Sequence, residues 1–138
     1  MPRRSTDIIL DSWSVLAYLE DEPPGEKVAD LIADAYEKGL GLMMTNVNAG
    51  EVWYIIARKT SEKEADNSIV ELKSLGIEFV AIDWKLARQA ALLKSKYKMS
   101  FADCFAAALA KEQNGELVTG DPEFKQVEHA VKIHWLYR

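Results

Sequence analysis

Short apolar runs alternate with segments of helical periodicity along the whole of this chain. The runs that we interpret as strands cover residues 8–10, 42–44, 77–82 and 117–118, with 131–133 as a fifth strand at an edge. They are apolar at nearly every position, which is typical of strands covered on both faces. Strands of this kind, each followed by a helix, favour a parallel sheet between two helical layers. The sequence therefore predicts an α/β protein, a three-layer α/β/α sandwich with a mostly parallel central sheet.

Helical spacing of apolar residues separates these strands. It predicts a first helix over residues 12–20, a break at Pro23, Pro24 and Gly25, and further helices around 28–35, 52–56, 65–72 and 86–93. A last helix, residues 101–110, is apolar on almost every side and should lie centrally. A chain of 138 residues, 49% of them hydrophobic, is expected to form one domain over residues 1–138.

Composition excludes several classes of protein. No apolar stretch approaches the roughly 20 residues of a membrane helix, and Asp7 follows the short N-terminal segment 1–5 where a leader would need a long apolar stretch. A single cysteine, Cys104, rules out an internal disulfide. These features lead us to expect a cytoplasmic protein without a membrane anchor.

The net charge of −5 argues against a protein held on nucleic acid by bulk electrostatics. The charge is uneven, however, because residues 20–37 carry seven acids against Lys27, whereas residues 85–98 carry five basic residues and no acid. The acidic run is best interpreted as a solvated helix face. For the basic run, which includes Lys94, Lys96 and Lys98, a solvated face and a phosphate-contacting face both remain open. Arg58 is a further candidate phosphate contact.

Four acids follow or adjoin the predicted strands. Asp11 directly follows the first, Glu51 comes shortly after the second, and Asp121 follows the fourth, while Asp103 lies in the first turn of the central helix. Ligands of open α/β sheets bind beyond the carboxyl ends of the strands, so these four side chains are expected to converge at one edge.

Helix capping is the competing explanation for each acid. Asp11 and Asp121 stand where an N-cap is expected, and the pairs Asn48–Glu51 and Ser100–Asp103 have the spacing of a capping box. Asn48 and Ser100 already supply the capping chemistry, which leaves Glu51 and Asp103 less fully explained. Clustered carboxylates repel one another unless a cation lies between them, and all-oxygen ligands suit Mg²⁺ or Mn²⁺. Such a metal activates water and neutralises phosphoryl charge, which indicates phosphodiester hydrolysis.

Four blocks of sequence resemble the PIN-domain family, and within it the VapC-like ribonuclease toxins of prokaryotic toxin–antitoxin pairs. The blocks are 9–12 (ILDS), 48–52 (NAGEV), 101–108 (FADCFAAA) and 117–124 (LVTGDPEF). The resemblance implies a PIN-like fold, cleavage of RNA, an acidic pocket for Mg²⁺ or Mn²⁺, a cognate antitoxin and a homodimer.

The resemblance also implies roles for single residues. Asp11 and Asp103 match the metal positions, Glu51 the second acid and Asp121 the fourth. Ser12 and Thr119 match hydroxyl positions that steady the carboxylates or a water. Trp13 departs from the family pattern, since many members have a smaller polar residue there, and it is expected to reshape the rim of the pocket.

Three alternatives remain open. A non-catalytic RNA-binding or protein-interaction module would keep the fold but is expected to have lost an acid. A haloacid dehalogenase-type phosphatase needs a second aspartate two residues after the first, where this chain has Trp13. His129 and His134 would be the acid and base of a metal-free ribonuclease, although strand-edge or surface histidines are the plainer interpretation.

Overall fold

The computed structural model describes residues 6–137, and the expectation about an N-terminal leader falls mainly on residues 1–5, outside that range. Five strands form one sheet: β1 (Ile8–Leu10), β2 (Leu42–Thr45), β3 (Ile77–Val80), β4 (Glu116–Thr119) and β5 (Lys132–Trp135). Their order is β3-β2-β1-β4-β5, and every pairing is parallel. The predicted α/β sandwich and the edge position of the fifth strand are therefore confirmed.

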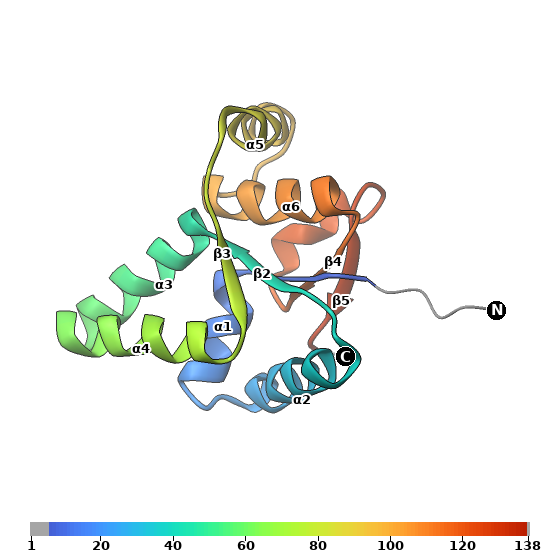
Figure 1. Ribbon diagram of the computed structural model, residues 1–138. Coiled ribbons are helices and arrows are strands. Elements are labelled where there is room, and N and C mark those ends of the chain that lie inside the picture. The colour runs from blue at the N-terminus through green and yellow to red at the C-terminus, as the bar shows by residue number, and fades with distance from the viewer. Residues whose placement is uncertain (1–5, 138) are drawn as a thin grey trace.

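Within residues 6–137, six α-helices and one 3-10 helix surround the sheet. They are α1 (Ser12–Leu19), α2 (Pro23–Lys38), α3 (Asn46–Lys59), α4 (Glu62–Ser74), α5 (Trp84–Lys96), α6 (Phe101–Gln113) and η1 (Pro122–Val127). Figure 1 shows α5 and α6 on one side of the sheet, with α2 and α4 on the other. Within the described chain, no helix is long and apolar enough to cross a bilayer.

The sheet divides the core into two clusters because side chains alternate along each strand. Ile8 and Leu10 of β1 pack with α1 to α4, whereas Ile9 packs with α5, α6 and η1. Helix α6 is buried continuously from Asp103 to Ala110, as its apolar sequence predicts. A sheet covered by helices on both faces thus carries the loops at its carboxyl edge.

Several predicted boundaries differ from the structure: α6 continues to Gln113 instead of residue 110, and β5 covers Lys132–Trp135 instead of 131–133. Two other boundaries have a local cause. Pro23 and Pro24 do not separate helices but begin α2, where a proline at the first position lacks only an amide that would be unpaired anyway. Gly25 lies so close to α1 that a β-carbon at this position would overlap the Ala17 carbonyl oxygen. Strand β3 ends at Val80 rather than at residue 82, because its partner β2 ends at Thr45, the residue that pairs with Val80. Asp83 then caps α5 by accepting the Leu86 amide at 2.9 Å.

Candidate active site

A cleft of about 340 Å³ lies at the carboxyl edge of the sheet. Its walls come from the starts of α1, α3 and α6 and from the loop between β4 and η1. The lining residues are Ser12, Trp13, Leu16, Glu51, Ile55, Ser100, Asp103, Asp121 and Glu123. Three of the four acids singled out in the sequence therefore share one cleft, and Asp11 is not among the residues that line it.

Asp103 is the most strongly perturbed acid of the cleft. One carboxylate oxygen each from Asp103, Asp121 and Glu123 lies within 4.8 Å of the others. Burial, above all, raises the pKa of Asp103 to about 9, with further contributions from a hydrogen bond to Glu123 and from the charges of Asp121 and Asp11. Asp103 does not cap α6, because Ser100 Oγ accepts the Asp103 amide N–H at 3.1 Å.

Asp11 is fully buried and both its oxygens are engaged. Oδ1 accepts the Ser14 amide N–H at 2.9 Å, which caps α1, and Oδ2 accepts the Thr119 hydroxyl at 2.5 Å. Burial raises the pKa of Asp11 to about 6, although these hydrogen bonds lower it. Asp11 therefore combines capping with a place next to the acidic cluster, since its charge also raises the pKa of Asp103.

Glu51 is held by the hydroxyl of Ser12, which donates to Glu51 Oε1. Beneath it, Asn48 is completely buried; its amide nitrogen donates to the Ala102 carbonyl at 3.0 Å, and its oxygen accepts the Thr45 hydroxyl at 2.6 Å. This network fixes the start of α3 against the start of α6. The capping-box interpretation of Asn48–Glu51 was wrong, because Thr45 is the N-cap and accepts the Asn48 amide at 3.0 Å.

The sequence did not indicate the part that two residues play in this region. Glu123 was not among the candidate acids, and Asn48 was not expected to join the start of α3 to the start of α6. Glu123 Oε1 accepts the Ser100 amide at 3.2 Å, and its carboxyl meets Asp103. Glu123 lies in the first turn of η1, where acids are common and need no functional explanation. Its position two residues after Asp121 was the one feature of the sequence that could have marked it as a site residue. Asp121 does cap η1, accepting the Glu123 amide at 2.9 Å.

Thr119 links two of the acids. Its hydroxyl donates to Asp11 and accepts the Asp121 backbone amide at 3.0 Å, so the end of β4 fixes the Asp11 carboxylate and the Asp121 backbone.

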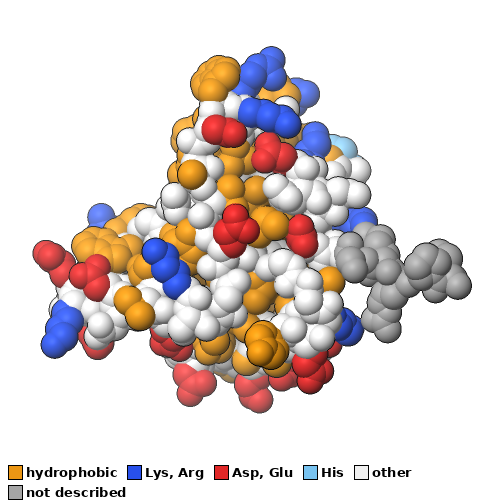
Figure 2. Space-filling model, in the orientation of Figure 1, with side chains coloured by type: hydrophobic (Ala, Val, Ile, Leu, Met, Phe, Trp, Pro, Cys, Tyr) orange, Lys and Arg blue, Asp and Glu red, His pale blue; other side chains and the backbone are white. Residues whose placement is uncertain are grey.

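None of the four candidate phosphate contacts lines the cleft. Lys94 Nζ donates to the Met99 carbonyl at 2.7 Å and so closes the loop between α5 and α6. The backbone of Lys98 is bonded to the Gln126 side chain, and the Arg58 guanidinium stands 5.0 Å from the Tyr54 ring centroid. Lys96 is exposed on α5, the helix over which basic side chains gather at the top of Figure 2.

The histidines lie elsewhere. His129 Nε2 is 3.2 Å from the Tyr97 hydroxyl, and His134 Nδ1 is 3.9 Å from Glu116. Neither lines the acidic cleft, so they do not form a second reactive centre within it.

The donor set of the cleft fits a hard divalent cation. Three carboxylates converge, and across residues 6–137 no ion pair joins any of them to a lysine or arginine. A cation would offset the repulsion that raises the pKa of Asp103, and oxygen-only ligands match Mg²⁺ or Mn²⁺.

A parallel sheet with acids gathered at its carboxyl edge makes this chain an α/β protein with an acidic cleft. The family model of the PIN domain matches residues 8–130, and the chain belongs to this family. A search of curated proteins finds no match.

Solved structures share the fold at low sequence identity. A DNA-bound VapBC from Salmonella typhimurium has a TM-score of 0.74 at 12% identity, covering 96% of this chain and 99% of that one. VapBC2 from Rickettsia felis, bound to a promoter DNA fragment, has a TM-score of 0.71 at 16% identity, covering 92% and 96%. VapC20 from Mycobacterium tuberculosis, described as a toxin that cleaves the sarcin–ricin loop, has a TM-score of 0.67 at 18% identity, covering 88% and 95%.

Proposed function

We propose that this protein is a metal-dependent endoribonuclease that hydrolyses RNA phosphodiester bonds and serves as the toxin of a toxin–antitoxin pair. The observation that carries the proposal is the approach of Asp103, Asp121 and Glu123 within 4.8 Å. Membership of the PIN domain family and the likeness to VapC-type folds support it.

In this proposal, Asp103, Asp121 and Glu123 would hold Mg²⁺ or Mn²⁺ in the cleft. Asp11 remains a candidate ligand, because each carboxylate oxygen that accepts one hydrogen bond keeps a second lone pair. When bound there, such a cation would make water a better nucleophile and would neutralise charge on the phosphate. Thr119 keeps Asp11 and Asp121 in place.

Glu51 has a separate part in the proposal. Ser12 binds Oε1, which fixes the carboxylate at the side of the cleft that α3 provides. We assign to Glu51 the acceptance of a proton from the attacking water. Removing the carboxylate is then expected to lower the rate of cleavage more than it lowers RNA affinity.

The test is cleavage of RNA after removal of metal. Activity is expected to stop with EDTA and to return with Mg²⁺ or Mn²⁺. Undiminished activity in EDTA would remove the metal from the proposal and favour His129 and His134 as acid and base. RNA binding without cleavage in either metal would favour the non-catalytic module.

The partners belong to the proposal as well. Solved structures of similar fold are described as VapBC, which supports a cognate antitoxin. A homodimeric toxin is proposed from the family resemblance of the sequence alone. Co-purification of this chain with the product of an adjacent small gene, followed by measurement of the mass of the complex, tests both points.

A further inference from the structure

The cleft has an apolar wall as well as an acidic one. Trp13 and Leu16 stand one turn apart on α1, and Ile55 faces the same cleft from α3. All three are partly exposed, although each also belongs to a packed helix. A cation and its phosphate ligand need only the acids, so this apolar surface is left without a role in the proposed reaction.

The indole of Trp13 has a fixed place in this wall. A β-carbon built on Gly120 would overlap Cη2 and Cζ3 of the Trp13 ring. The six-membered ring therefore rests directly on the Gly120 backbone. Gly120 does not have a positive φ, so its backbone conformation does not require glycine. Glycine is needed here because a side chain would overlap the Trp13 ring.

Contact with Gly120 places the ring beside the acids. Gly120 is joined directly to Asp121, and Asp121 shares the acidic cluster with Asp103. An aromatic plane thus stands next to the position where carboxylates would hold a cation. A volume of about 340 Å³ is within the range of about 300–1,000 Å³ that small-molecule pockets have.

A nucleotide has the matching chemistry. Its phosphate binds a divalent cation, and its base has a planar apolar face that stacks on aromatic side chains without regard to sequence. An apolar side chain of a protein would also suit Trp13, Leu16 and Ile55, but it offers nothing for the acids of the same cleft. The juxtaposition of the two walls favours the nucleotide.

We infer that Trp13 is the stacking platform for the base next to the scissile phosphate, and that Gly120 is required to seat it. This inference rests on the proposed function. It predicts that the substrate presents an unpaired base at the cleavage site, as in a loop or a single strand, because a base within a duplex already has stacking partners on both faces.

Nucleoside monophosphates test the inference without cleavage, because they contain no phosphodiester bond. Wild-type protein in Mg²⁺ is titrated with the four ribonucleoside 5′-monophosphates and with ribose 5-phosphate, which lacks the base. Binding of the nucleotides is expected to be about tenfold tighter or more, within the range that base–aromatic stacking supplies. Quenching of tryptophan emission should accompany it.

Variants assign the effect to one ring. Trp13→Leu should bind nucleotides and ribose 5-phosphate equally, whereas Trp13→Phe should keep part of the preference. Trp84, which is 75% exposed on α5 and outside the cleft, provides the matched control: Trp84→Leu should retain the full preference and the quenching.

Equal affinity of wild-type protein for nucleotides and ribose 5-phosphate would overturn the stacking role, and this comparison needs no variant. Unchanged preference in Trp13→Leu would overturn it as well. The proposed function fails separately, if RNA is not cleaved in Mg²⁺ or Mn²⁺. Cleavage with no preference for the base would therefore leave the nuclease and remove only the platform.

Discussion

The hydroxyl of Thr119 donates to Asp11 Oδ2 over 2.5 Å and joins the ends of two neighbouring parallel strands, β4 and β1. Both residues are completely buried. A carboxylate at that depth is costly unless its oxygens are hydrogen-bonded. This contact is therefore part of what keeps the candidate site assembled.

The first prediction concerns this hydroxyl. Thr119→Val keeps the shape but leaves Asp11 Oδ2 and the Asp121 amide without their partner. The free energy of unfolding, measured by urea denaturation, should fall by about 1–3 kcal/mol, the cost of burying an unpaired polar group. Thr119→Ser keeps the hydroxyl and serves as the control. An unchanged midpoint for Thr119→Val would show that the contact contributes nothing to stability.

The second prediction concerns pH in the absence of metal. The pKa values of Asp11 and Asp103 are raised to about 6 and about 9 in the folded protein, so the folded state binds more protons than the unfolded state above pH 4. Their contribution to stability is complete below about pH 4 and is lost as pH rises towards 9. The midpoint of thermal unfolding should therefore decrease over that interval.

Two comparisons check the cause of that pH dependence. Asp103→Asn should flatten the slope, whereas Asp30→Asn, at an exposed position of α2, should not. Mg²⁺ should stabilise the protein most at high pH, because only deprotonated carboxylates bind the metal. A slope that Asp103→Asn leaves unchanged would contradict the assignment.

The sequence predicted the layers because their causes are local. Strands apolar at nearly every position had to be covered on both faces, and the continuous apolar surface of α6 required a central place. The order of the strands depends on how long connections cross the sheet, and no pattern within a strand encodes it. Pro23 was misread because the same residue that ends one helix can begin the next.

The site was predictable as a set of acids and not as a geometry. Asp103 and Glu51 were recognised because Ser100 and Asn48 could supply the caps. The structure confirms Ser100 as a cap but has Thr45 in place of Asn48. Whether an acid such as Asp11 is exposed or bonded at both oxygens depends on partners more than 100 residues away, as with Thr119. Glu123 was not recognised because its contacts with Ser100 and Asp103 also join separate segments of the chain, with Ser100 lying 23 residues away.

The third prediction concerns the basic run of residues 85–98, in which Lys94 is expected to differ from Lys96 and Lys98. Lys94, Lys96 and Lys98 are all exposed, but the Lys94 ammonium is also bonded to the Met99 carbonyl. In an Asp103→Asn background that does not cleave RNA, replacing Lys94, Lys96 and Lys98 with Ala should weaken binding and reduce the salt slope. The slope should fall by about 0.7 for each phosphate that the protein no longer neutralises, the value for single strands.

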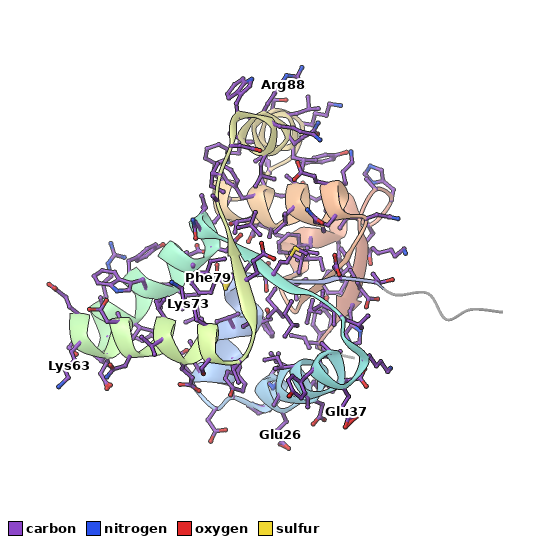
Figure 3. All side chains as sticks on the ribbon, in the orientation of Figure 1. Glu26, Glu37, Lys63, Lys73, Phe79 and Arg88 are labelled. Carbon is purple, nitrogen blue, oxygen red and sulfur yellow. The ribbon has the colours of Figure 1, made fainter. Side chains whose placement is uncertain are left out.

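Single variants separate the two roles within the run. Lys94→Ala alone should lower the unfolding midpoint and change the salt slope least. Lys63→Ala, on α4 at the far left of Figure 3, should change neither RNA affinity nor the slope. A salt slope that the triple variant leaves unchanged would show that the run is a solvated face.

The last prediction separates catalysis from capping at the start of α6. Ser100 Oγ accepts the Asp103 amide, so Ser100→Ala should cost about 1 kcal/mol of stability, the usual value of an N-cap. Asp103→Asn leaves that cap intact and removes a carboxylate that its neighbours oppose. Without metal, its thermal midpoint should be unchanged or higher than that of the wild type.

For activity, the larger loss is expected in Asp103→Asn and the smaller one in Ser100→Ala. Asp103→Asn should lower the rate of RNA cleavage by orders of magnitude, since metal-assisted charge stabilisation supplies several kcal/mol to such reactions. It should also abolish the stabilisation that Mg²⁺ gives to the wild-type protein, a readout that does not depend on substrate. Ser100→Ala should still be stabilised by Mg²⁺, because it retains Asp103, Asp121 and Glu123. An Asp103→Asn protein that is active but less stable would assign the residue to the helix terminus instead of the metal.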